Sequence, residues 1–285
     1  YPLYHVKDQL FDLNNDSYEE VNLFGLNDEK ATELRNTLRT ELLTFENRPY
    51  QEFTDPNVDL TVATENTSIL GKVLAGYQGW FNMPTDGSDL NWKHYQTSIS
   101  GVKKFEPGFT SVDYWPDMSE ADDDEKYTTS FSHKDGRTAH VFSSVNAKTV
   151  NRHFKWMNDY GIDGVFFQQF ASGLKSNAPK LKANDNLVFD NIIAAAQANN
   201  NRLVSVMYDL SGSNATSTMV EDVKLHWESL VSRHGVNDNS NNHLLTYKQK
   251  PVVALWGVGF NRTDNYDLDD VQELINYFKN DATYG

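Results

Sequence analysis

The 285-residue sequence contains no cysteine. Disulfide bonds, thiolate metal ligands and a cysteine nucleophile are therefore excluded. Exported bacterial proteins and cytoplasmic proteins can both lack cysteine, so the redox compartment stays open at this point.

Long apolar runs and positive charge are also scarce. No stretch approaches the roughly 18 apolar residues of a membrane span, so we predict no membrane insertion. Lysine and arginine number 25 against 40 acidic residues, and the net charge of −15 repels phosphate backbones, so nucleic acid is not an expected partner. The chain opens on Tyr1 rather than on methionine, and we expect a processed or excerpted piece of a longer protein.

Histidine, serine and acidic residues show no established metal-binding or nucleophile pattern. The histidines lack the H-x-x-x-H and H-E-x-x-H spacings of zinc sites, and Ser143-Ser144 lacks the G-x-S-x-G elbow. The acidic run at residues 122–125 favours a solvated loop over a cation site. We therefore expect no metal and no cofactor.

Aromatic residues are abundant, and they gather at the ends of predicted strands. Trp, Tyr and Phe make up 13% of the chain, which suits the flat faces of sugar rings as well as a bulky core. Segments that read as strands and end in an aromatic or polar cluster are residues 73–81, 111–117, 163–170, 203–209 and 252–257. Helical patterns separate the later ones, which is the order of a βα barrel, whose active sites lie at the carboxyl ends of the strands.

The number of strands predicts an unfinished barrel. These segments supply five or six strands, depending on whether residues 139–144 form a barrel strand or an excursion. A closed barrel of this type needs eight strands. We therefore predict an α/β fold of the (β/α)8 TIM-barrel type that is incomplete in this chain, completed by further strands or by a partner segment.

Three regions are expected along the chain. Residues 1–49 read as a small α+β unit, a hairpin followed by a helix with Leu34 on its apolar face, which is too small to hold a core alone. Residues 50–69 read as a linker, and residues 70–285 as the partial barrel. The helices expected in the barrel region carry Val150, Phe154 and Met157; Val223, Trp227, Leu230 and Val231 before Gly235; and Val271, Leu274, Ile275 and Phe278 after an N-cap at Asp267 with Asp270 three residues on.

The first region resembles the C-terminal end of a sulfatase. Residues 9–16 (QLFDLNND), followed by residues 19–23 (EEVNL) and an amphipathic helix, match a family signature that precedes the last helix, with Ser17 where the family usually has proline. The sulfatase nucleophile and calcium ligands belong to an upstream region, so the resemblance implies an upstream sulfatase domain rather than sulfatase activity in this chain.

The barrel region resembles glycoside hydrolase families 99 and 71, the endo-α-mannosidase-like enzymes. The matching segments are residues 76–82 with 86–87 and 92–94, 113–117, 142–144 with 153–157, 160–165 and 208–212. The resemblance implies a retaining glycosidase with two carboxylates on a late strand. No match to that late-strand motif follows Trp256, so the resemblance also implies that the catalytic pair is missing from this chain.

Candidate site residues follow from the strand ends together with this resemblance. Those assigned to substrate binding are Tyr77, Gln78, Trp80, His94, Asp113, Trp115, Asp117, Gln168, Gln169, Tyr208 and Trp256, and the candidate catalytic carboxylate is Asp209. Core packing is the alternative for Tyr77 and Trp80, and a turn or N-cap role is the alternative for Asp209. Only one of Gln168 and Gln169 can face the barrel interior, because strand side chains alternate.

The sequence thus favours part of a secreted, periplasmic or cell-surface bacterial enzyme that degrades an α-mannan-like glycan and is fused to a sulfatase. The expected partner is a polysaccharide or oligosaccharide. Three lysines in residues 171–182 extend this expectation to a sulfated glycan, with a solvated loop as the alternative. The rival from another class is a non-catalytic carbohydrate-binding or scaffold domain that kept the cleft and lost the acids.

Overall fold

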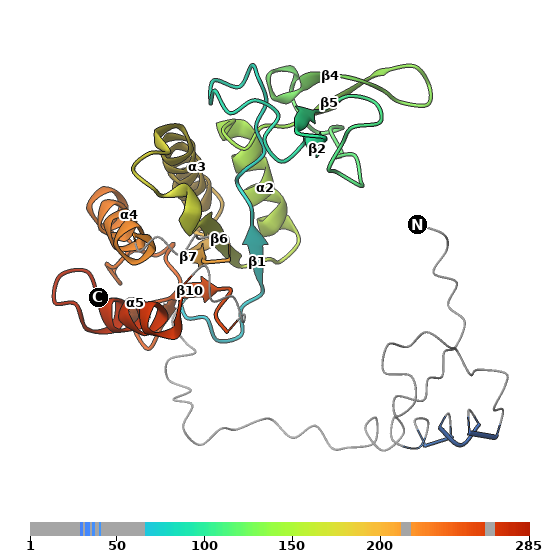
Figure 1. Ribbon diagram of the computed structural model, residues 1–285. Helices are drawn as coiled ribbons and strands as arrows, with labels where there is room; N and C mark the ends of the chain where they lie inside the picture. The colour runs from blue at the N-terminus through green and yellow to red at the C-terminus, as the bar shows by residue number, and fades with distance from the viewer. Residues whose placement is uncertain are drawn as a thin grey trace. The chain divides into compact units, whose positions relative to one another are not determined.

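The computed structural model describes residues 29, 30, 32–34, 36, 37, 40, 66–211, 218–259 and 266–285 (Figure 1). The chain divides into two units, residues 1–58 and residues 59–285. In the first unit the described residues are helical, within the helix expected there. The predicted hairpin, most of the sulfatase-like segment and most of the linker lie outside the described residues.

The second unit is mixed α/β and is built on a parallel sheet. Its four strands are β1 (Leu74–Tyr77), β6 (Gly164–Phe170), β7 (Leu203–Asp209) and β10 (Val253–Trp256), and they lie in that order. The sequence order and the spatial order of the strands agree. This arrangement confirms the α/β prediction and is consistent with part of a TIM-barrel-like fold.

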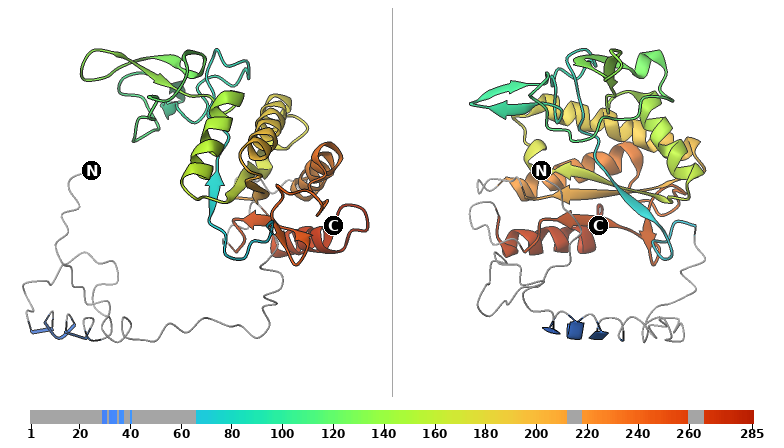
Figure 2. Two further views of the ribbon diagram at one scale, coloured as in Figure 1. Left: turned by 180° about the vertical axis from the view of Figure 1, so that it is seen from behind. Right: turned by 90° about the vertical axis from the view of Figure 1, so that its right-hand side faces the viewer.

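One α-helix lies in the chain between each pair of neighbouring strands of the sheet, and a further α-helix follows β10. The helices are α2 (Ala147–Asp159), α3 (Pro179–Ala198), α4 (Met219–His234) and α5 (Leu268–Asn280). Figures 1 and 2 show α2, α3 and α4 side by side along the sheet. None of the described helices is long and apolar enough to cross a membrane.

The two faces of the sheet differ because strand side chains alternate. Val165 and Phe167 of β6 and their register partners Val204 and Val206 of β7 are buried in the core beneath the helices. The alternate positions point to the other face, which we call the open face, where Phe166 is only half-buried.

The close approach of β6 and β7 explains why residue 164 is a glycine. A Cβ on Gly164, the first residue of β6, would lie 2.1 Å from the carbonyl oxygen of Leu203 in β7. Only glycine allows this spacing without a backbone shift.

The local helix signals are confirmed. Val150, Phe154 and Met157 are the buried apolar positions of α2. Gly235 ends α4 in the left-handed region at φ +59°, which glycine adopts without strain. Asp267 caps α5, and with Asp270 it forms the predicted capping box.

The strand count is corrected to four parallel strands among the described residues. Residues 111–117 form no strand. Residues 139–141 belong to β5 (Thr138–Val141), which pairs antiparallel with β4 (Tyr127–Ser132) and so is an excursion. The short strands β2 (Thr97–Ile99), β3 (Val102–Lys104), β8 (Thr246–Tyr247) and β9 (Lys250–Pro251) also pair outside the parallel sheet.

The excursion between β1 and α2 has a small core of its own. Met83, Tyr95, Phe105 and Val141 are buried together, with Trp115 packed against them. The aromatic content of residues 111–117 therefore serves this second core and not a strand of the barrel.

Candidate functional site

Three polar side chains join neighbouring strands at their carboxyl ends. Gln78, which follows β1, donates from Nε2 to Oε1 of Gln168 in β6 over 3.3 Å. Gln168 donates from Nε2 to Oδ2 of Asp209 at the end of β7 over 2.7 Å. We call these three residues the strand-end network, and it lies on the open face at the edge where barrel enzymes place their sites.

Asp209 is held from both of its oxygens. Its Oδ1 accepts from the backbone N–H of Ser211 at 2.9 Å and from the Ser211 hydroxyl at 2.5 Å. Asp209 as a residue is 3% exposed. With Gln168 it therefore accepts three hydrogen bonds, which fix its direction.

Trp256 extends this row to the fourth strand. It ends β10 in register with Asp209, and the backbone N–H of Leu210 donates to its carbonyl oxygen at 3.0 Å. Register partners in a parallel pair point to the same face, so Trp256 stands beside Asp209. Trp256 is 52% exposed, so this large aromatic residue is open to a ligand.

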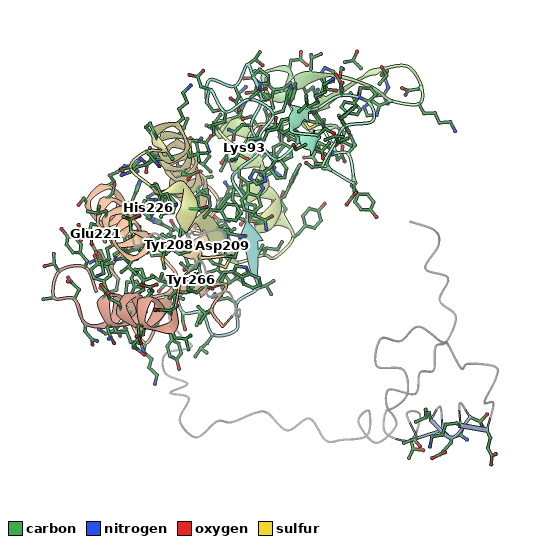
Figure 3. The ribbon with its side chains drawn as sticks, in the orientation of Figure 1. Lys93, Tyr208, Asp209, Glu221, His226 and Tyr266 are labelled. Carbon is green, nitrogen blue, oxygen red and sulfur yellow. The ribbon has the colours of Figure 1, made fainter. Side chains whose placement is uncertain are left out.

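Tyr77 and Tyr208 point to the helix-covered face. The hydroxyl of Tyr77 shares a hydrogen bond with Nδ1 of His153 in α2 at 2.9 Å, and that of Tyr208 does so with Nδ1 of His226 in α4, also at 2.9 Å. In Figure 3 His226 lies on the α4 side of Tyr208. The structure therefore places both tyrosines in the core, the alternative already named for Tyr77.

Both members of each pair are neutral. Burial raises the pKa of Tyr77 and of Tyr208. Burial also lowers the pKa of His153 to about 4 and that of His226 to about 3. These pairs tie strands to helices, which is a structural role.

Trp80, His94 and Gln169 meet at a cavity of about 100 Å³. Trp80 stacks on His94 and on Phe170, with ring centroids 4.6 Å and 4.8 Å away. Burial, with the positive charge of Lys93, lowers the pKa of His94 to about 4. Gln168 and Gln169 both line this cavity, although their side chains leave β6 on opposite faces, as the alternation of side chains requires.

Asp113, Trp115 and Asp117 lie in the excursion. Trp115 donates from its indole to the carbonyl oxygen of His140 at 2.8 Å and packs among aromatic rings. Asp113 and Asp117 are exposed, and the pKa of Asp117 is lowered by hydrogen bonds from Ser119. Among the described residues none of the three contacts the strand-end network.

The acidic run is organised around basic side chains. Asp122, Asp124 and Glu125 bring carboxylate oxygens within 4.8 Å of one another. Lys148 pairs with Asp122 and Asp124, and Arg152 pairs with the buried Glu125 at 2.5 Å. The cluster is thus an ion-pair network joining the 3-10 turn at Asp123–Glu125 to α2.

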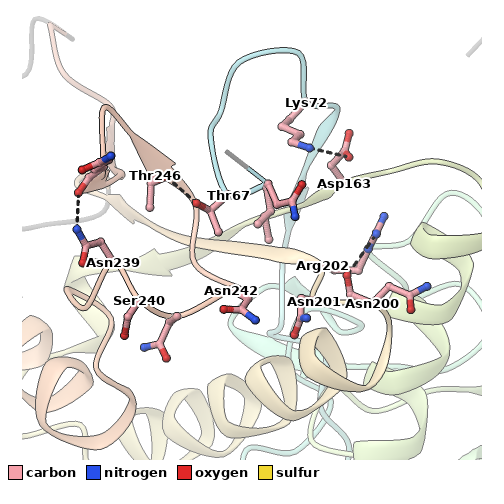
Figure 4. Close-up of a pocket in the computed structure, with 14 residues that line it drawn as sticks. Thr67, Lys72, Asp163, Asn200, Asn201, Arg202, Asn239, Ser240, Asn242 and Thr246 are labelled. Atoms are coloured by element: carbon pink, nitrogen blue, oxygen red, sulfur yellow. Dashed lines mark hydrogen bonds and ion pairs between the residues drawn. The ribbon is translucent and has the colours of Figure 1, made fainter. Parts of the chain in front are cut away.

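A larger pocket of about 730 Å³ lies at the opposite edge of the sheet (Figure 4). Its amide-bearing wall consists of Asn66, Asn200, Asn201, Asn239, Asn241, Asn242 and Gln249. Thr67 and Thr246 share a hydrogen bond there at 2.9 Å, and Lys72 pairs with Asp163. This pocket lies at the amino-terminal edge of the strands. In barrel enzymes the residues at that edge contribute to stability, whereas catalytic residues lie at the carboxyl-terminal edge.

Sequence reasoning missed several residues of the small cavity. Asn82, Lys93, Asn184 and Asp185 line it, and burial raises the pKa of Asp185 to about 6, against a hydrogen bond from Asn184. Asn82 and Lys93 lie within segments that carried the glycosidase resemblance. Asn184 and Asp185 lie within α3 and have no sequence signal of their own.

No protein-family model matches the chain, and no curated protein matches it significantly. Among solved structures it is similar to an endo-alpha-mannosidase of glycoside hydrolase family 99 from Bacteroides thetaiotaomicron, with 15% identity and a TM-score of 0.36 over 68% of this chain and 46% of the other. A structure of such an enzyme with bis-tris propane matches with 12% identity and a TM-score of 0.36, over 68% and 42%.

This chain therefore spans less than half the length of the solved structures that it matches. At this TM-score the likeness carries no functional argument. The site has to be interpreted from its own geometry.

Proposed function

We propose that the open face of the sheet is one half of the interior of a (β/α)8 barrel, and that a glycan binds across its strand ends in a glycoside hydrolase completed by further strands. The strand-end network is the observation that supports this proposal. It places hydrogen-bonding groups on three adjacent strands, with the exposed Trp256 on the fourth.

The chemistry of this row suits sugar hydroxyls. Each glutamine amide offers two donors and an acceptor, and the Asp209 carboxylate offers acceptors only. Gln78 is exposed, so it can exchange its long 3.3 Å bond to Gln168 for a ligand. Trp256 provides the apolar surface on which a sugar ring can stack.

Hydrolysis requires more than this chain offers on the open face. Glycosidases use a pair of carboxylates that flank the scissile bond, and Asp209 is one carboxylate, with three hydrogen bonds that hold it as an acceptor. We therefore assign Asp209 to holding Gln168 in position for the sugar, and the acid pair to strands that complete the barrel. The 285-residue chain should bind a glycan without cleaving it.

The alternative function is non-catalytic carbohydrate binding. The engagement of Asp209 with Ser211 favours it, because a carboxyl group that accepts bonds on both oxygens is a poor proton donor. The two functions differ in the longer protein. A carboxylate pair on its later strands with measurable turnover supports the enzyme, and binding without turnover supports the scaffold.

Calorimetric titration of the 285-residue chain with an α-mannan oligosaccharide tests the shared premise. Trp256→Ala should weaken binding about tenfold, because aromatic contacts of this kind contribute roughly 1 kcal/mol or more. Tyr160→Ala is the matched control, since Tyr160 is an exposed aromatic beyond the end of α2. Equal weakening by both variants, or unchanged affinity in Trp256→Ala, would contradict the proposal.

We also propose a sulfated substrate and export with a fused sulfatase domain. Two of the loop lysines, Lys175 and Lys182, are half-buried, and Lys180 pairs with Asp89 at 3.2 Å on an exposed surface. Such exposed pairs contribute at most about 1 kcal/mol each. Binding of a sulfated glycan that weakens with salt, while its desulfated form binds less tightly, is the expected result.

A further inference from the structure

The pocket of about 730 Å³ at the amino-terminal edge of the sheet is large enough for a ligand. Small-molecule sites in proteins have volumes of about 300–1,000 Å³. None of the residues that line this pocket belongs to the strand-end network or lines the small cavity beside β6 and α3. The pocket is therefore separate from the site on the open face.

Three stretches of the chain build most of its wall. Residues 66, 67 and 72 precede β1, residues 200–203 lead into β7, and residues 239–242, 246 and 249 lie between α4 and β9. Figure 4 shows labelled side chains of all three stretches around the pocket.

The backbone along this wall is already paired. The N–H of Thr246 donates to the carbonyl oxygen of Thr67, and the N–H of Ile69 donates to the carbonyl oxygen of Thr246, both at 2.8 Å. The N–H of Leu203 donates to the carbonyl oxygen of Asp163, also at 2.8 Å. A peptide that binds as an added strand needs free backbone groups at a sheet edge, and these groups are not available to it.

The charged side chains of the wall have partners within the chain. Nζ of Lys72 lies 3.7 Å from Oδ1 of Asp163, and Oδ2 of Asp163 accepts from the backbone N–H of Val73 at 2.8 Å. Arg202 donates to three backbone carbonyl oxygens, at 3.1, 3.2 and 3.5 Å. The wall therefore favours a ligand without net charge.

Three of the amide groups support the wall itself. Nδ2 of Asn239 donates to the carbonyl oxygen of Gln249 at 3.1 Å, and Nδ2 of Asn241 donates to that of Gly235 at 3.0 Å. Nδ2 of Asn200 donates to a side-chain oxygen on α2 at 2.8 Å. The packing of the loops explains why these positions carry amides.

The amides of Asn66, Asn201 and Asn242 are not used in this way. All three residues are exposed and line the pocket, and no hydrogen bond joins their side chains to another of the described residues. The left-handed backbone of Asn201, at φ +51°, explains why an asparagine suits that position. Neither a hydrogen bond nor a left-handed backbone explains Asn242. Its amide is available to a ligand.

The chemistry of the wall matches the hydroxyl groups of a sugar. Each amide offers donors and an acceptor, and the hydroxyl group of Ser240 offers both as well. A sugar hydroxyl also donates and accepts, so one ring can bond to several of these groups at once. The described residues that line the pocket include no aromatic side chain, so binding here depends on hydrogen bonds and not on stacking.

We propose that this pocket is a second, non-catalytic binding site for a neutral sugar, held by the amides of Asn201 and Asn242. Barrel enzymes place their chemistry at the opposite edge of the sheet, so a ligand in this pocket is bound and not cleaved. The proposal does not depend on the proposed function, because it uses no residue of the open face.

Titration of the 285-residue chain with mannobiose, followed by NMR of the side-chain amide resonances, tests the proposal. The resonances of Asn201 and Asn242 should shift in a saturable way. Sodium sulfate and N-acetylglycinamide, an anion and a small neutral peptide, should cause no saturable shift.

Three results of this titration overturn the proposal. A saturable response to sulfate would show an anion site at Arg202. A response to N-acetylglycinamide as strong as that to mannobiose would show a polar pocket without preference for sugars. A linear response to mannobiose would show that the amides only meet solvent.

Variants identify the amides that bind, and affinity is followed on the pocket amide that remains. Asn242→Ala should weaken mannobiose binding about three- to tenfold, the loss expected for one hydrogen bond. Asn201→Gly is the second variant, because glycine adopts φ +51° without strain and so keeps the turn. Asn276→Ala is the matched control, since Asn276 is exposed on α5 and does not line the pocket. Unchanged affinity in both pocket variants, or equal weakening by the control, overturns the proposal.

The Trp256→Ala variant separates this proposal from the proposed function. The shift of Asn242 should persist in this variant, because Trp256 does not line the pocket. If Asn242 responds to mannobiose while Trp256→Ala leaves binding of the α-mannan oligosaccharide unchanged, the proposed function fails and the pocket stands. If Trp256→Ala weakens binding of the oligosaccharide while Asn242 does not respond to mannobiose, the pocket fails alone.

Discussion

The two faces of the parallel sheet carry opposite chemistry from the same strands. On β7, Tyr208 is buried against His226 and makes a neutral pair beneath the helices. One residue later, Asp209 ends the same strand on the open face and accepts bonds from Gln168 and Ser211. The place of a residue along the strand therefore does not indicate its role. The face of the sheet to which its side chain points does, and this face alternates from one residue to the next.

The difference follows from what covers each face. Helices α2, α3 and α4 exclude water from one face, so ionisable groups there stay neutral and serve packing. The open face has no helix over it among the described residues, and Gln78 and Trp256 are exposed there. Between the two faces, a sugar-binding role is therefore argued only for side chains that point to the open face.

The largest expected effect is a difference in stability loss when two adjacent phenylalanines of β6 are replaced by alanine. Phe167 is 1% exposed on the helix-covered face, so Phe167→Ala should lower the free energy of unfolding by about 3–5 kcal/mol. Phe166 is half-buried on the open face, and Phe166→Ala should cost about 1 kcal/mol. Chemical denaturation of the 285-residue chain measures both.

This pair also tests whether the open face is covered in solution. A loss in Phe166→Ala as large as that in Phe167→Ala would mean that another surface packs on the open face of the chain. The same measurement repeated over a range of protein concentrations shows whether that surface comes from a second copy.

The next expected effect is a dependence of stability on pH, caused by histidines on the helix-covered face. Burial holds the pKa of His153 at about 4 and that of His226 at about 3, whereas an unfolded histidine titrates near 6.5. Between those values the unfolded chain binds more protons. Stability that is fully present above about pH 6.5 is therefore lost as the pH falls, by up to about 1.4 kcal/mol per pH unit for each histidine.

Asp185 changes the stability in the opposite direction as the pH falls. The contribution of His226 is therefore measured as the difference in unfolding free energy between the unaltered chain and a variant. Its pKa is raised to about 6, and that contribution to stability is lost as the pH rises through this value. Unfolding free energies of the unaltered chain and of His226→Gln should converge as the pH falls from about 7 to about 5. A constant difference over that range would show that His226 is not held neutral.

Local signals in the sequence predicted much of the fold. The capping box of α5, the glycine that ends α4 and the apolar spacing of α2 all act within a few residues, and all are confirmed. Residues 163–170 and 203–209, predicted as strands that end in an aromatic or polar cluster, form β6 and β7. The error lay at residues 111–117, where aromatic content resembled a strand but belongs to the core of the excursion.

The site was harder to predict because its contacts join distant residues. The alternation of Gln168 and Gln169 was evident from the sequence, but which of them faces Asp209 depends on the register of β6 with β7. The cavity depends on the contact of Asn82 with Asn184, 102 residues apart in the chain. No local pattern reports such a contact.

The smallest expected effect contrasts two glutamines, one on each face. Gln78 is exposed, and its bond to Gln168 is long, so Gln78→Leu should change the free energy of unfolding by no more than about 0.5 kcal/mol. Gln169 is buried with an unpaired oxygen, so Gln169→Leu should leave stability unchanged or raise it by roughly 1 kcal/mol. Thermal and chemical unfolding of both variants measures this contrast.

For binding of the glycan, we expect the larger effect in Gln78→Leu, because Gln78 belongs to the open face. Gln78→Leu removes a donor from the strand-end network, so it should weaken binding of the α-mannan oligosaccharide while stability stays constant. A stability loss in Gln78→Leu as large as that of a core substitution would show instead that Gln78 holds the strands together. In that case the row of polar groups on the open face would be structural, and the distinction between the two faces would rest on Trp256 and Asp209 alone.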